Sequence, residues 1–329
     1  MNMKKKEINC PEEEIEFKFL PHKKRSLMLS ESLYRLHLEN RSLRVKECGT
    51  FIEMRKYDKK YIAEGEREWK LSTANFCRDR LCSMCNWRRS LKIFGQVSKI
   101  MDNIPDSYRF IFLTLTVKNC KGSELKYTVR HLLSSFKKMA NYKPFKQVFK
   151  GYFRTLECTH NHIENSYHPH LHVILAVNKS YFKSKNYISH SKFVEMWQKA
   201  LKISYEPQVN IQKIKDERHM VAEVAKYAVK SDDYIIEDNL EYTDEIVMNF
   251  IIGMSNVRLI AYGGIFNEVR KKLDLDDAEN GDLVHVNNDT LRSDVSYMVY
   301  NFHWSSGIRN YTLKKEMVYN VQIECDEDN

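Results

Sequence analysis

Three histidines occupy every second position of one short apolar segment, at His168, His170 and His172. Side chains alternate between the two faces of a β-strand, so these imidazoles would share one face while the apolar residues between them enter a core. Neutral ring nitrogens are good ligands for divalent metals, and a rigid strand can aim two or three of them at one ion. The segment therefore predicts a strand that carries a metal site, in preference to solvated histidines on a polar face.

A second group of metal-binding side chains lies in Cys77-x4-Cys82-x2-Cys85, with Cys48 as the candidate fourth ligand. Thiolates at this spacing suit tetrahedral zinc, and a site closed by four protein ligands is structural rather than catalytic. The alternative is a set of buried or free cysteines. The spacing favours structural zinc over that alternative.

Residues 151–159 and 109–117 are two further β-rich segments. The first of them contains one carboxylate, Glu157. Two imidazoles and one carboxylate would leave open coordination positions for a phosphate oxygen and a water, as a catalytic metal requires. From the residues alone, Glu157 is equally well explained as a charge at the exposed end of a strand. His160 and His162 follow in a polar segment and are expected to be solvated.

Residues 218–230 have the apolar periodicity of an amphipathic helix. At 3.6 residues per turn, Glu223, Tyr227 and Lys230 fall on one polar stripe. A neutral tyrosine hydroxyl is a weak nucleophile because its pKa is about 10, and a nearby metal and cation favour the phenolate. Periodicity by itself favours an ordinary surface tyrosine. Tyr234, past the expected end of the helix, is a rival nucleophile.

The chain has 329 residues, 43% of them hydrophobic, and a formal net charge of +9. This length supports one or two domains with a sizeable core, and the charge suits a polyanionic partner. The start has no apolar signal-peptide region, and no run of about 18 apolar residues occurs, so a cytoplasmic protein without a membrane span is expected. The sequence has no phosphate-binding loop of an ATP-driven motor.

Basic residues are concentrated in two runs, both interspersed with aromatic side chains that could stack on bases. The runs are Arg78, Arg80, Arg88, Arg89 and Lys92, and Lys137, Lys138, Lys143, Lys146 and Lys150, with Trp87, Phe136, Tyr142, Phe145 and Phe149 among or beside them. Acidic residues collect late, between Asp274 and Asp282 and in the tail. We expect the basic runs to contact nucleic-acid phosphates, with a solvated protein face as the alternative.

Five segments together resemble the motifs of the rolling-circle plasmid replication initiators of Rep family 1, in the HUH endonuclease superfamily. They are the cysteine-rich stretch 76–92, the strand 109–117, the H-x-H pair with its apolar run, the E-V-A-K-Y-x-x-K helix, and the Gly-Gly segment 258–266. The motifs occur in the family's order within residues 45–305. The glycines of the last segment permit a tight turn or a close backbone approach, and we assign it no chemistry.

The resemblance implies an α+β fold: the antiparallel ferredoxin-like sheet of HUH nucleases with its helices, plus a zinc-binding segment. It implies His170 and His172 as the metal-binding pair, Glu157 as their carboxylate partner, and Mn²⁺ or Mg²⁺ as the catalytic metal. His168 falls outside the pair, as a substrate contact or a partner of the ligands. The four cysteines would hold structural Zn²⁺.

The resemblance also implies that Tyr227 is the nucleophile. Glu223 would position or activate a water, and Lys230 would hold a phosphate or stabilise the phenolate. The protein would nick plasmid origin DNA, single-stranded or in a hairpin at the nick site, form a 5′-phosphotyrosine link, and later close or release the strand. A host helicase and DNA polymerase would supply unwinding and synthesis.

Two other functions are compatible with these residues. One is a related tyrosine nuclease acting as a transposase or mobilisation relaxase, and the other is a non-catalytic zinc-containing DNA-binding protein. The oligomeric state is open, with a homo-oligomer as one option. We expect four segments: an N-terminal extension (1–45), a cysteine-rich zinc-binding segment (46–100), an HUH catalytic core (101–240) and a mixed C-terminal extension with an acidic tail (241–329).

Overall fold

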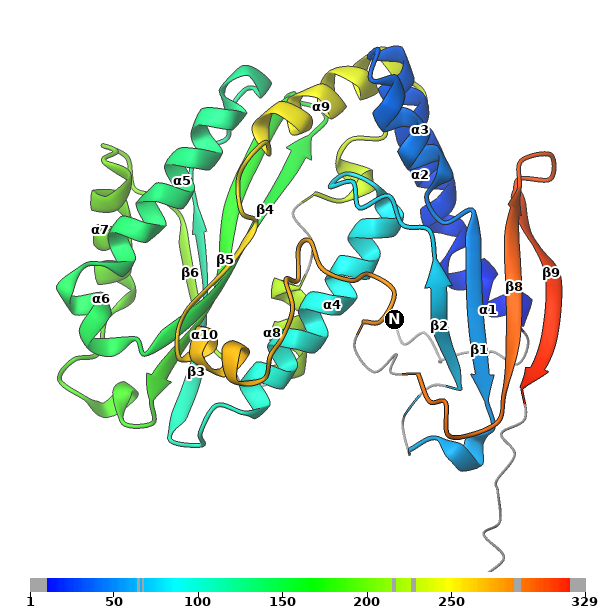
Figure 1. Ribbon diagram of the computed structural model, residues 1–329. Helices are drawn as coiled ribbons and strands as arrows, with labels where there is room; N and C mark the ends of the chain where they lie inside the picture. Colours follow the sequence, from blue (N-terminus) through cyan, green and yellow to red (C-terminus); the bar gives the residue numbers. More distant parts are fainter. Residues whose placement is uncertain are drawn as a thin grey trace, which may run out of the picture. The chain divides into compact units, whose positions relative to one another are not determined.

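The computed structural model describes residues 11–63, 66, 68–214, 217–225, 229–286 and 291–319. The chain forms two compact units (Figure 1). Unit 1 comprises Met1–Glu31, Leu38–Arg88 and Asp282–Asn329, and unit 2 comprises Ser32–His37 and Arg89–Gly281. The four functional segments expected from the sequence stay predictions.

Unit 1 is built on a four-stranded antiparallel sheet in the order β2-β1-β8-β9. Ile52 and Met54 alternate with partly exposed residues along β1 and are buried, as expected of a strand with one covered face. The strands are β1 (Phe51–Tyr57), β2 (Trp69–Ala74), β8 (Tyr297–Ser305) and β9 (Asn310–Tyr319). Helices α1 (Pro11–Lys18) and α3 (Glu39–Glu47) and the 3-10 turn η1 (Lys59–Tyr61) belong to this unit, and α2 (Leu20–Arg35) begins in it.

Unit 2 is built on a five-stranded antiparallel sheet in the order β6-β3-β5-β4-β7. The strands are β3 (Tyr108–Thr116), β4 (Gly151–Asn161), β5 (Ser166–Asn178), β6 (Val209–Lys213) and β7 (Ile260–Gly264). The helices are α4 (Ser83–Asp102, which begins in unit 1), α5 (Leu125–Ala140), α6 (Lys143–Val148), α7 (His190–Leu201), α8 (Glu217–Val224), α9 (Leu240–Gly253) and α10 (Ile265–Lys272). Short 3-10 turns are η2 (Gly122–Glu124), η3 (Tyr181–Lys183) and η4 (Ser231–Asp233).

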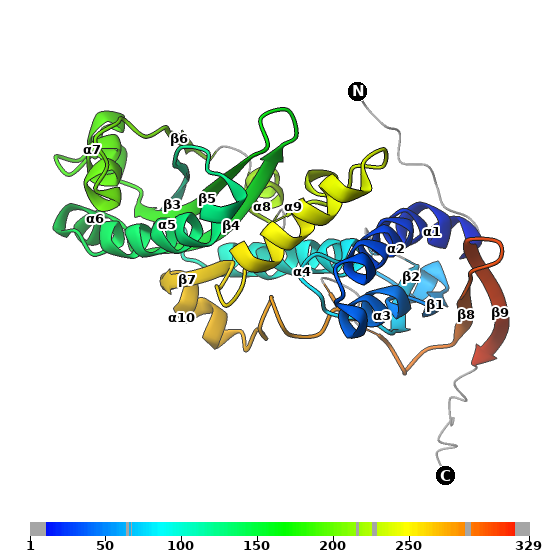
Figure 2. The same cartoon turned by 90° about the horizontal axis from the view of Figure 1, so that it is seen from above.

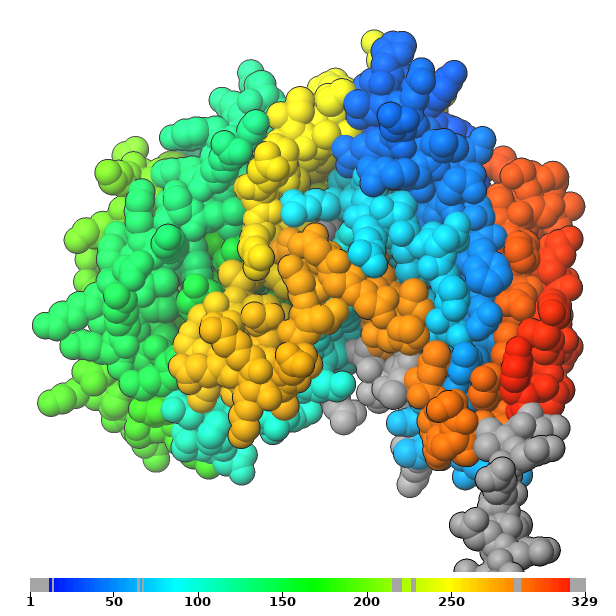
Figure 3. Space-filling model, viewed as in Figure 1, coloured from blue at the N-terminus to red at the C-terminus, as the bar shows by residue number. Residues whose placement is uncertain are grey.

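Strand β5 lies at the centre of the unit 2 sheet. Leu171, Val173 and Leu175 on one of its faces are fully buried. Helix α5 packs on this face, where Phe136 meets Tyr152 of β4 edge-on with ring centroids 5.1 Å apart. Figures 1 and 2 show α5, α6 and α7 gathered on one side of the sheet, and the side chains of α5, α9 and α10 form much of the surface of unit 2 in Figure 3. The histidines occupy the opposite face, where α8 contacts β5.

The sequence-based expectations for the strands are confirmed. The runs 109–117, 151–159 and 168–175 correspond to β3, β4 and β5, which are adjacent in one antiparallel sheet. The α+β class is likewise confirmed, since helices and antiparallel strands make up both units. The ferredoxin-like assignment stays a prediction.

The two glycines of β7 permit a close approach to β4. A Cβ atom on Gly264 would lie 2.1 Å from the carbonyl oxygen of Lys150, and the φ of Gly264 is +54°. A Cβ atom on Gly263 would lie 2.3 Å from the ring of Tyr152. Only glycine therefore lets β7 pair with β4 along this stretch.

The expectation that the first basic run contacts phosphates is wrong for Arg88, Arg89 and Lys92, which are buried. Arg88 donates to two backbone carbonyls of the segment after residue 282. Arg89 donates to the carbonyl oxygen of Glu279, and Lys92 forms an ion pair with Asp276. Residues 276–284 therefore supply hydrogen-bond acceptors to these three cations inside the protein, because a buried charge must be hydrogen-bonded or paired.

The second basic run keeps its expected exposure, but three of its aromatic residues are buried. Lys137, Lys138, Lys143, Lys146 and Lys150 are all exposed. Phe136, Phe145 and Phe149 are buried in the core and cannot stack on bases. The lysines stay predicted phosphate contacts, and the stacking expectation is wrong for these three rings.

No helix in the described part of the chain combines the length and apolar character needed to cross a membrane.

Candidate active site and metal centres

Strand register brings Glu157, His170 and His172 to one face of the unit 2 sheet. His170 of β5 pairs with Glu157 of β4, and His172 pairs two residues along with Thr155. On the other side of β5, His172 pairs with Thr114 of β3. Because neighbouring strands in register present paired residues on the same face, the carboxylate and both imidazoles converge.

The ligand atoms of the three side chains have the spacing expected around one metal ion. The Nε2 atoms of His170 and His172 are 3.1 Å apart, and the Glu157 Oε2 atom lies 3.1 Å from His172 Nε2 and 3.5 Å from His170 Nε2. Adjacent ligands of an octahedral ion with bonds of about 2.1 Å lie roughly 3.0 Å apart. The three residues therefore fit one face of an octahedral site, with the remaining positions open.

Hydrogen bonds orient both imidazoles. His170 donates from Nδ1 to the backbone oxygen of His168, 3.1 Å away, which leaves its Nε2 lone pair facing the other ligands. The Nδ1 atom of His172 lies 3.2 Å from the hydroxyl of Thr114, and its ring stacks on Phe112 with centroids 5.4 Å apart. A partner on the far ring nitrogen fixes the tautomer and the direction of a metal-binding histidine.

Glu157 is buried but ionised. Burial would raise the pKa of Glu157, but its close contacts with the His170, His172 and Lys230 side chains outweigh burial and hold its pKa well below the usual range. The Lys230 ammonium lies 2.9 Å from Glu157 Oε1, and although burial lowers the pKa of Lys230, this carboxylate raises it above its usual value. The site thus contains a carboxylate held in its charged form, as a metal ligand must be.

The prediction that one helix carries Lys230 together with Glu223 is wrong. Helix α8 ends at Val224, and Lys230 has an extended backbone with φ −88° and ψ 152°. Its N–H donates to the Asp233 carboxylate, 3.0 Å away, which caps the turn η4. Lys230 thus belongs to the start of η4, and its side chain reaches Glu157 from there.

The predicted nucleophile Tyr227 lies outside the described residues, in the stretch 226–228. Glu223 lies on α8, and its charge contributes to raising the pKa of Lys230, so the two side chains are near each other. Tyr234, the rival nucleophile, is fully buried, with its ring 6.4 Å from that of Phe250. Its burial removes Tyr234 from contact with a DNA phosphate.

His168 does not join the three ligands. It donates from Nδ1 to the Asn119 side-chain oxygen, 2.7 Å away, and its ring lies 5.2 Å from the ring of His170. It therefore connects the histidine face of β5 to the segment after β3. The H-x-H pattern separated His168 from the pair, but no sequence signal pointed to Asn119.

The expectation that His160 is solvated is wrong. His160 is buried at the end of β4 and donates from Nε2 to the Asn165 side-chain oxygen, while its Nδ1 atom lies 2.9 Å from that of His162. His162 in turn lies 3.1 Å from the backbone oxygen of Asp232, and the backbone N–H of His160 points at the Asp233 carboxylate. These contacts attach the segment after Tyr227 to β4, and only the structure reveals them.

The four cysteines of unit 1 also converge. Cys48 Sγ lies 3.6 Å from both Cys82 Sγ and Cys85 Sγ, and Cys77 Sγ lies 3.7 Å from Cys85 Sγ. Ligands of a tetrahedral zinc ion with Zn–S bonds of about 2.3 Å are roughly 3.8 Å apart, whereas a disulfide requires about 2.05 Å. The spacing fits a closed four-thiolate site, and it includes the candidate fourth ligand Cys48.

The surroundings of the cysteines suit a negatively charged cluster. Backbone N–H groups of residues 77, 78 and 79 point at the sulfurs of Cys48, Cys85 and Cys77, at 3.2–3.4 Å. The buried Lys23 donates to the carbonyl oxygen of Cys48, 2.8 Å away. Donors and a cation at this position would compensate the charge of bound thiolates.

Comparison with known proteins places the chain in a family. The family model described as "Replication protein" matches residues 68–312. A "Protein rep" of Bacillus amyloliquefaciens is 39% identical over 276 residues, covering 74% of this chain and 78% of the relative. A "Protein rep" of Lactiplantibacillus plantarum is 40% identical over 255 residues, with the same coverage of 74% and 78%.

A further "Protein rep", of Streptococcus pneumoniae serotype 2, is 35% identical over 282 residues and covers 83% of this chain and 84% of the relative. No solved structure matches the chain significantly. Since the family match spans most of the chain and the relatives align over most of their own length, the chain belongs to the replication-protein family, among the plasmid replication initiators of Rep family 1.

Proposed function

We propose that this protein starts rolling-circle replication by nicking one strand of plasmid origin DNA with Tyr227. The observation that carries the proposal is the convergence of Glu157, His170 and His172 with the Lys230 ammonium on one sheet face of a replication protein. A buried carboxylate, two oriented imidazoles and a cation form a site suited to a divalent metal and a phosphate. A metal and a cation at this position would stabilise the charge that develops when a weak nucleophile attacks a phosphate.

Glu157, His170 and His172 would hold Mn²⁺ or Mg²⁺, with imidazole ligands favouring manganese. When bound, the metal would neutralise charge on the scissile phosphate. Lys230 would add a second positive charge at the same place. Lys230 lies only three residues after Tyr227, so the two Cα atoms are at most about 11 Å apart, which is compatible with attack by Tyr227 on the same phosphate.

The covalent step exchanges one phosphodiester for another. The Tyr227 phenolate oxygen forms a bond to phosphorus while the bond from phosphorus to the 3′ oxygen breaks. The tyrosine proton leaves to water or a nearby base, and the leaving 3′ oxygen takes up a proton to become a hydroxyl. The products are a 5′-phosphotyrosine link and a 3′-hydroxyl, which a host polymerase can extend after a host helicase opens the duplex.

The four cysteines would bind Zn²⁺ in a structural role, because all four thiolates close the coordination sphere and leave no position for substrate. The link would later be broken at the bond between phosphorus and the Tyr227 oxygen, which leaves and regains a proton: attack by a 3′-hydroxyl would rejoin the strand, and attack by water would release it with a 5′-phosphate.

The test is incubation of the full chain with a supercoiled plasmid carrying its origin, with and without Mn²⁺ or Mg²⁺. We expect relaxed circles bearing covalent protein only when metal is present. His172→Ala should abolish the adduct, whereas His303→Ala, which removes an exposed histidine of β8, should leave it unchanged. Origin binding without any adduct would instead support a non-catalytic DNA-binding protein.

A further inference from the structure

The outer sides of α5 and α6 in unit 2 carry a dense set of positive charges. Residues 125–150 contain seven lysines and arginines and no aspartate or glutamate, and all seven cations are exposed. We call these seven side chains the α5–α6 surface; they are Lys126, Arg130, Lys137, Lys138, Lys143, Lys146 and Lys150. Cations gathered without a carboxylate among them repel one another, and a polyanion relieves that repulsion.

The packing of the two helices directs these charges outward. Phe136 of α5 and Phe145 of α6 are buried, with ring centroids 6.5 Å apart. Lys126, Arg130 and Lys137 fall within about 40° of one another around α5 and span roughly 16 Å of its axis. Because Lys126 and Arg130 are four residues apart, their like charges destabilise the helix. A bound anion would remove this cost.

The α5–α6 surface lies on the side of the sheet away from the candidate metal centre. Phe136 of α5 meets Tyr152 of β4, which pairs with Leu175 of β5. His172 stands three residues before Leu175 in the same strand, so its side chain belongs to the opposite face. Figures 1 and 2 show α5 and α6 on one side of this sheet. A DNA segment on these helices is therefore distinct from the segment at the metal centre.

The aromatic rings of this region are poorly placed to stack on bases. The three phenylalanines of the run are buried. Tyr127 is exposed, but its ring is stacked on that of His131, with centroids 5.8 Å apart and planes 6° from parallel. The ammonium of Lys199 of α7 lies over the ring of Tyr142, 5.8 Å from its centroid. Proteins that bind single strands rely on base stacking, whereas duplex DNA presents about one phosphate charge per 1.7 Å of its axis. The α5–α6 surface therefore suits a duplex.

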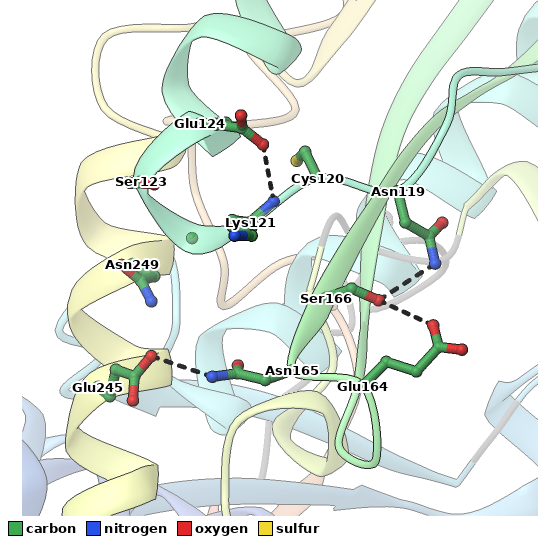
Figure 4. A pocket seen from close by; sticks show the side chains of 11 residues that line it. Asn119, Cys120, Lys121, Ser123, Glu124, Glu164, Asn165, Ser166, Glu245 and Asn249 are labelled. Carbon is green, nitrogen blue, oxygen red and sulfur yellow. Dashed lines mark hydrogen bonds between the residues drawn. The ribbon is translucent and has the colours of Figure 1, made fainter.

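Carboxylates gather just beyond one end of the α5–α6 surface. Glu124, Glu164 and Glu245 line a polar groove before the N-terminus of α5, together with the turn between β4 and β5 (Figure 4). Glu124 accepts a hydrogen bond from the backbone N–H of residue 121, and Glu245 accepts one from Asn165. These carboxylates would repel a phosphate, so a bound duplex would lie over the remainder of α5 and over α6.

We propose that the α5–α6 surface binds the phosphate backbone of duplex origin DNA, while the opposite face of the same sheet holds the strand to be nicked. The cations reach phosphates and not base edges, so they add affinity and fix the position of the duplex without reading its sequence. The inference rests on the proposed function, because the bound duplex is the part of the origin beside the nick site.

The test measures the affinity of the full chain for two probes, without added Mn²⁺ or Mg²⁺ and in a Tyr227→Phe background. One probe is an origin duplex of about 30 base pairs, roughly three helical turns, that stops short of the nick site. The other is a short single strand that contains the nick site. Lys137→Gln with Lys146→Gln removes one exposed cation from each helix and keeps the length of both side chains.

The matched control is Lys59→Gln with Lys60→Gln, which removes the same charge from η1 in unit 1. Both lysines are exposed and have carboxylate neighbours, Glu68 at 3.3 Å and Asp58 at 3.7 Å. All four substitutions are at exposed positions, so the fold should survive in both variants, and the thermal midpoint verifies this.

We expect the Lys137/Lys146 variant to bind the duplex about tenfold or more weakly at ~0.1 M salt. Each lost phosphate contact should reduce the slope of log affinity against log salt by about 0.9, so two contacts should reduce it by close to 2. Affinity for the single strand should fall far less than affinity for the duplex. The Lys59/Lys60 control should match the background protein with both probes.

Several results would overturn the inference. They are undetectable duplex binding by the background protein, an unchanged duplex affinity in the Lys137/Lys146 variant, and an equal loss in the Lys59/Lys60 control. An equal loss for both probes would also overturn it, because the cations would then serve the strand at the metal centre. The nicking function is judged separately, by the covalent adduct that the unmodified protein forms with origin plasmid and metal.

Discussion

At the scale of single residues, the candidate active site depends on which nitrogen of each imidazole is free. His170 uses Nδ1 to bond its own strand at residue 168, and His172 has its Nδ1 atom beside Thr114. Both Nε2 atoms therefore face Glu157. Loss of such an orienting partner typically weakens a metal site by about 10–100-fold, so we expect Thr114 to matter nearly as much to the proposed metal site as its proposed ligands.

Tyr227→Phe should abolish the covalent protein–DNA adduct and leave binding of origin DNA unchanged. The substitution removes the attacking oxygen and alters no charge. Adduct formation on labelled origin oligonucleotide, followed on a denaturing gel, measures the first effect, and a filter-binding titration measures the second.

Tyr234→Phe is the matched control for this prediction. Tyr234 is fully buried, so the loss of its hydroxyl should leave the adduct in place. Adducts from Tyr227→Phe but not from Tyr234→Phe would show that the nucleophile is assigned to the wrong residue.

Glu223→Ala should still nick the origin and form the Tyr227 adduct, but it should fail to end replication after one round. A protein with one nucleophilic tyrosine per subunit needs another attacking group for its last cut, and water activated by a carboxylate would release the enzyme. Loss of a general base typically costs about 10²–10⁴-fold in rate. Over-length single strands should therefore accumulate in cells, and unit-length products from this variant would show that another group activates the water.

At the scale of elements, the sheet of unit 2 depends on the backbone contact between β7 and β4. Gly264 has φ +54°, and a Cβ atom there would lie 2.1 Å from the carbonyl oxygen of Lys150. Gly307, in the β8–β9 turn, has no atom within 4 Å of an added Cβ and serves as a comparison.

Gly264→Ala should lower the free energy of unfolding by ~2 kcal/mol or more. A left-handed conformation costs a non-glycine residue about 1–2 kcal/mol, and the contact with β4 adds to this cost. Gly307→Ala should change stability by less than ~0.5 kcal/mol. Urea unfolding of both variants measures the difference, and equal midpoints would contradict the role given to the β7–β4 contact.

The elements of the sheet could be predicted from the sequence where a local pattern determines them. The apolar runs at β3 and β5 and the alternating histidines of β5 are such patterns, so the converging imidazoles were foreseeable. The sequence also predicted the strand that contains Glu157. The residues alone did not decide whether this carboxylate is a metal ligand or an exposed charge at the end of a strand. In a sheet whose faces are covered, the strand register then determines which side chains share a face and lie next to each other.

Other features depend on partners far away in the chain, and local patterns do not reveal them. Arg89 and Lys92 have the composition of a DNA-binding run, yet their partners Glu279 and Asp276 lie more than 180 residues later. His160 stands in a polar segment but is buried against the segment after the tyrosine. Lys230 continues the helical periodicity in the sequence, yet in the structure its N–H bonds to Asp233 at the start of a separate turn, a local hydrogen bond that periodicity does not reveal.

At the scale of the whole molecule, the chain carries a formal charge of +9 and folds into two units that contain different candidate sites. The candidate active site and the exposed lysines of α5 and α6 belong to unit 2. Unit 1 contains the cysteine cluster, whose proposed zinc would contribute folding free energy directly.

Cys82→Ser should therefore reduce the zinc content of the purified protein and lower its thermal midpoint by about 10 °C or more. Cys120→Ser is the control, since Cys120 is buried in unit 2 and is not one of the four cysteines of the cluster. It should keep full zinc content. Elemental analysis that finds no zinc in unmodified protein purified without a chelator would remove the basis of this prediction.

The strand order of unit 1 has a consequence for how the protein folds during its synthesis on the ribosome. β1 ends at Tyr57, but its neighbour β8 begins at Tyr297, and all of unit 2 except Ser32–His37 is synthesised between them. At about 5–20 residues per second, β1 waits on the order of 10–50 s for the strand that completes its pairing. The four cysteines have all been made by residue 85, so we expect metal capture, rather than sheet formation, to hold the nascent first unit together during this interval.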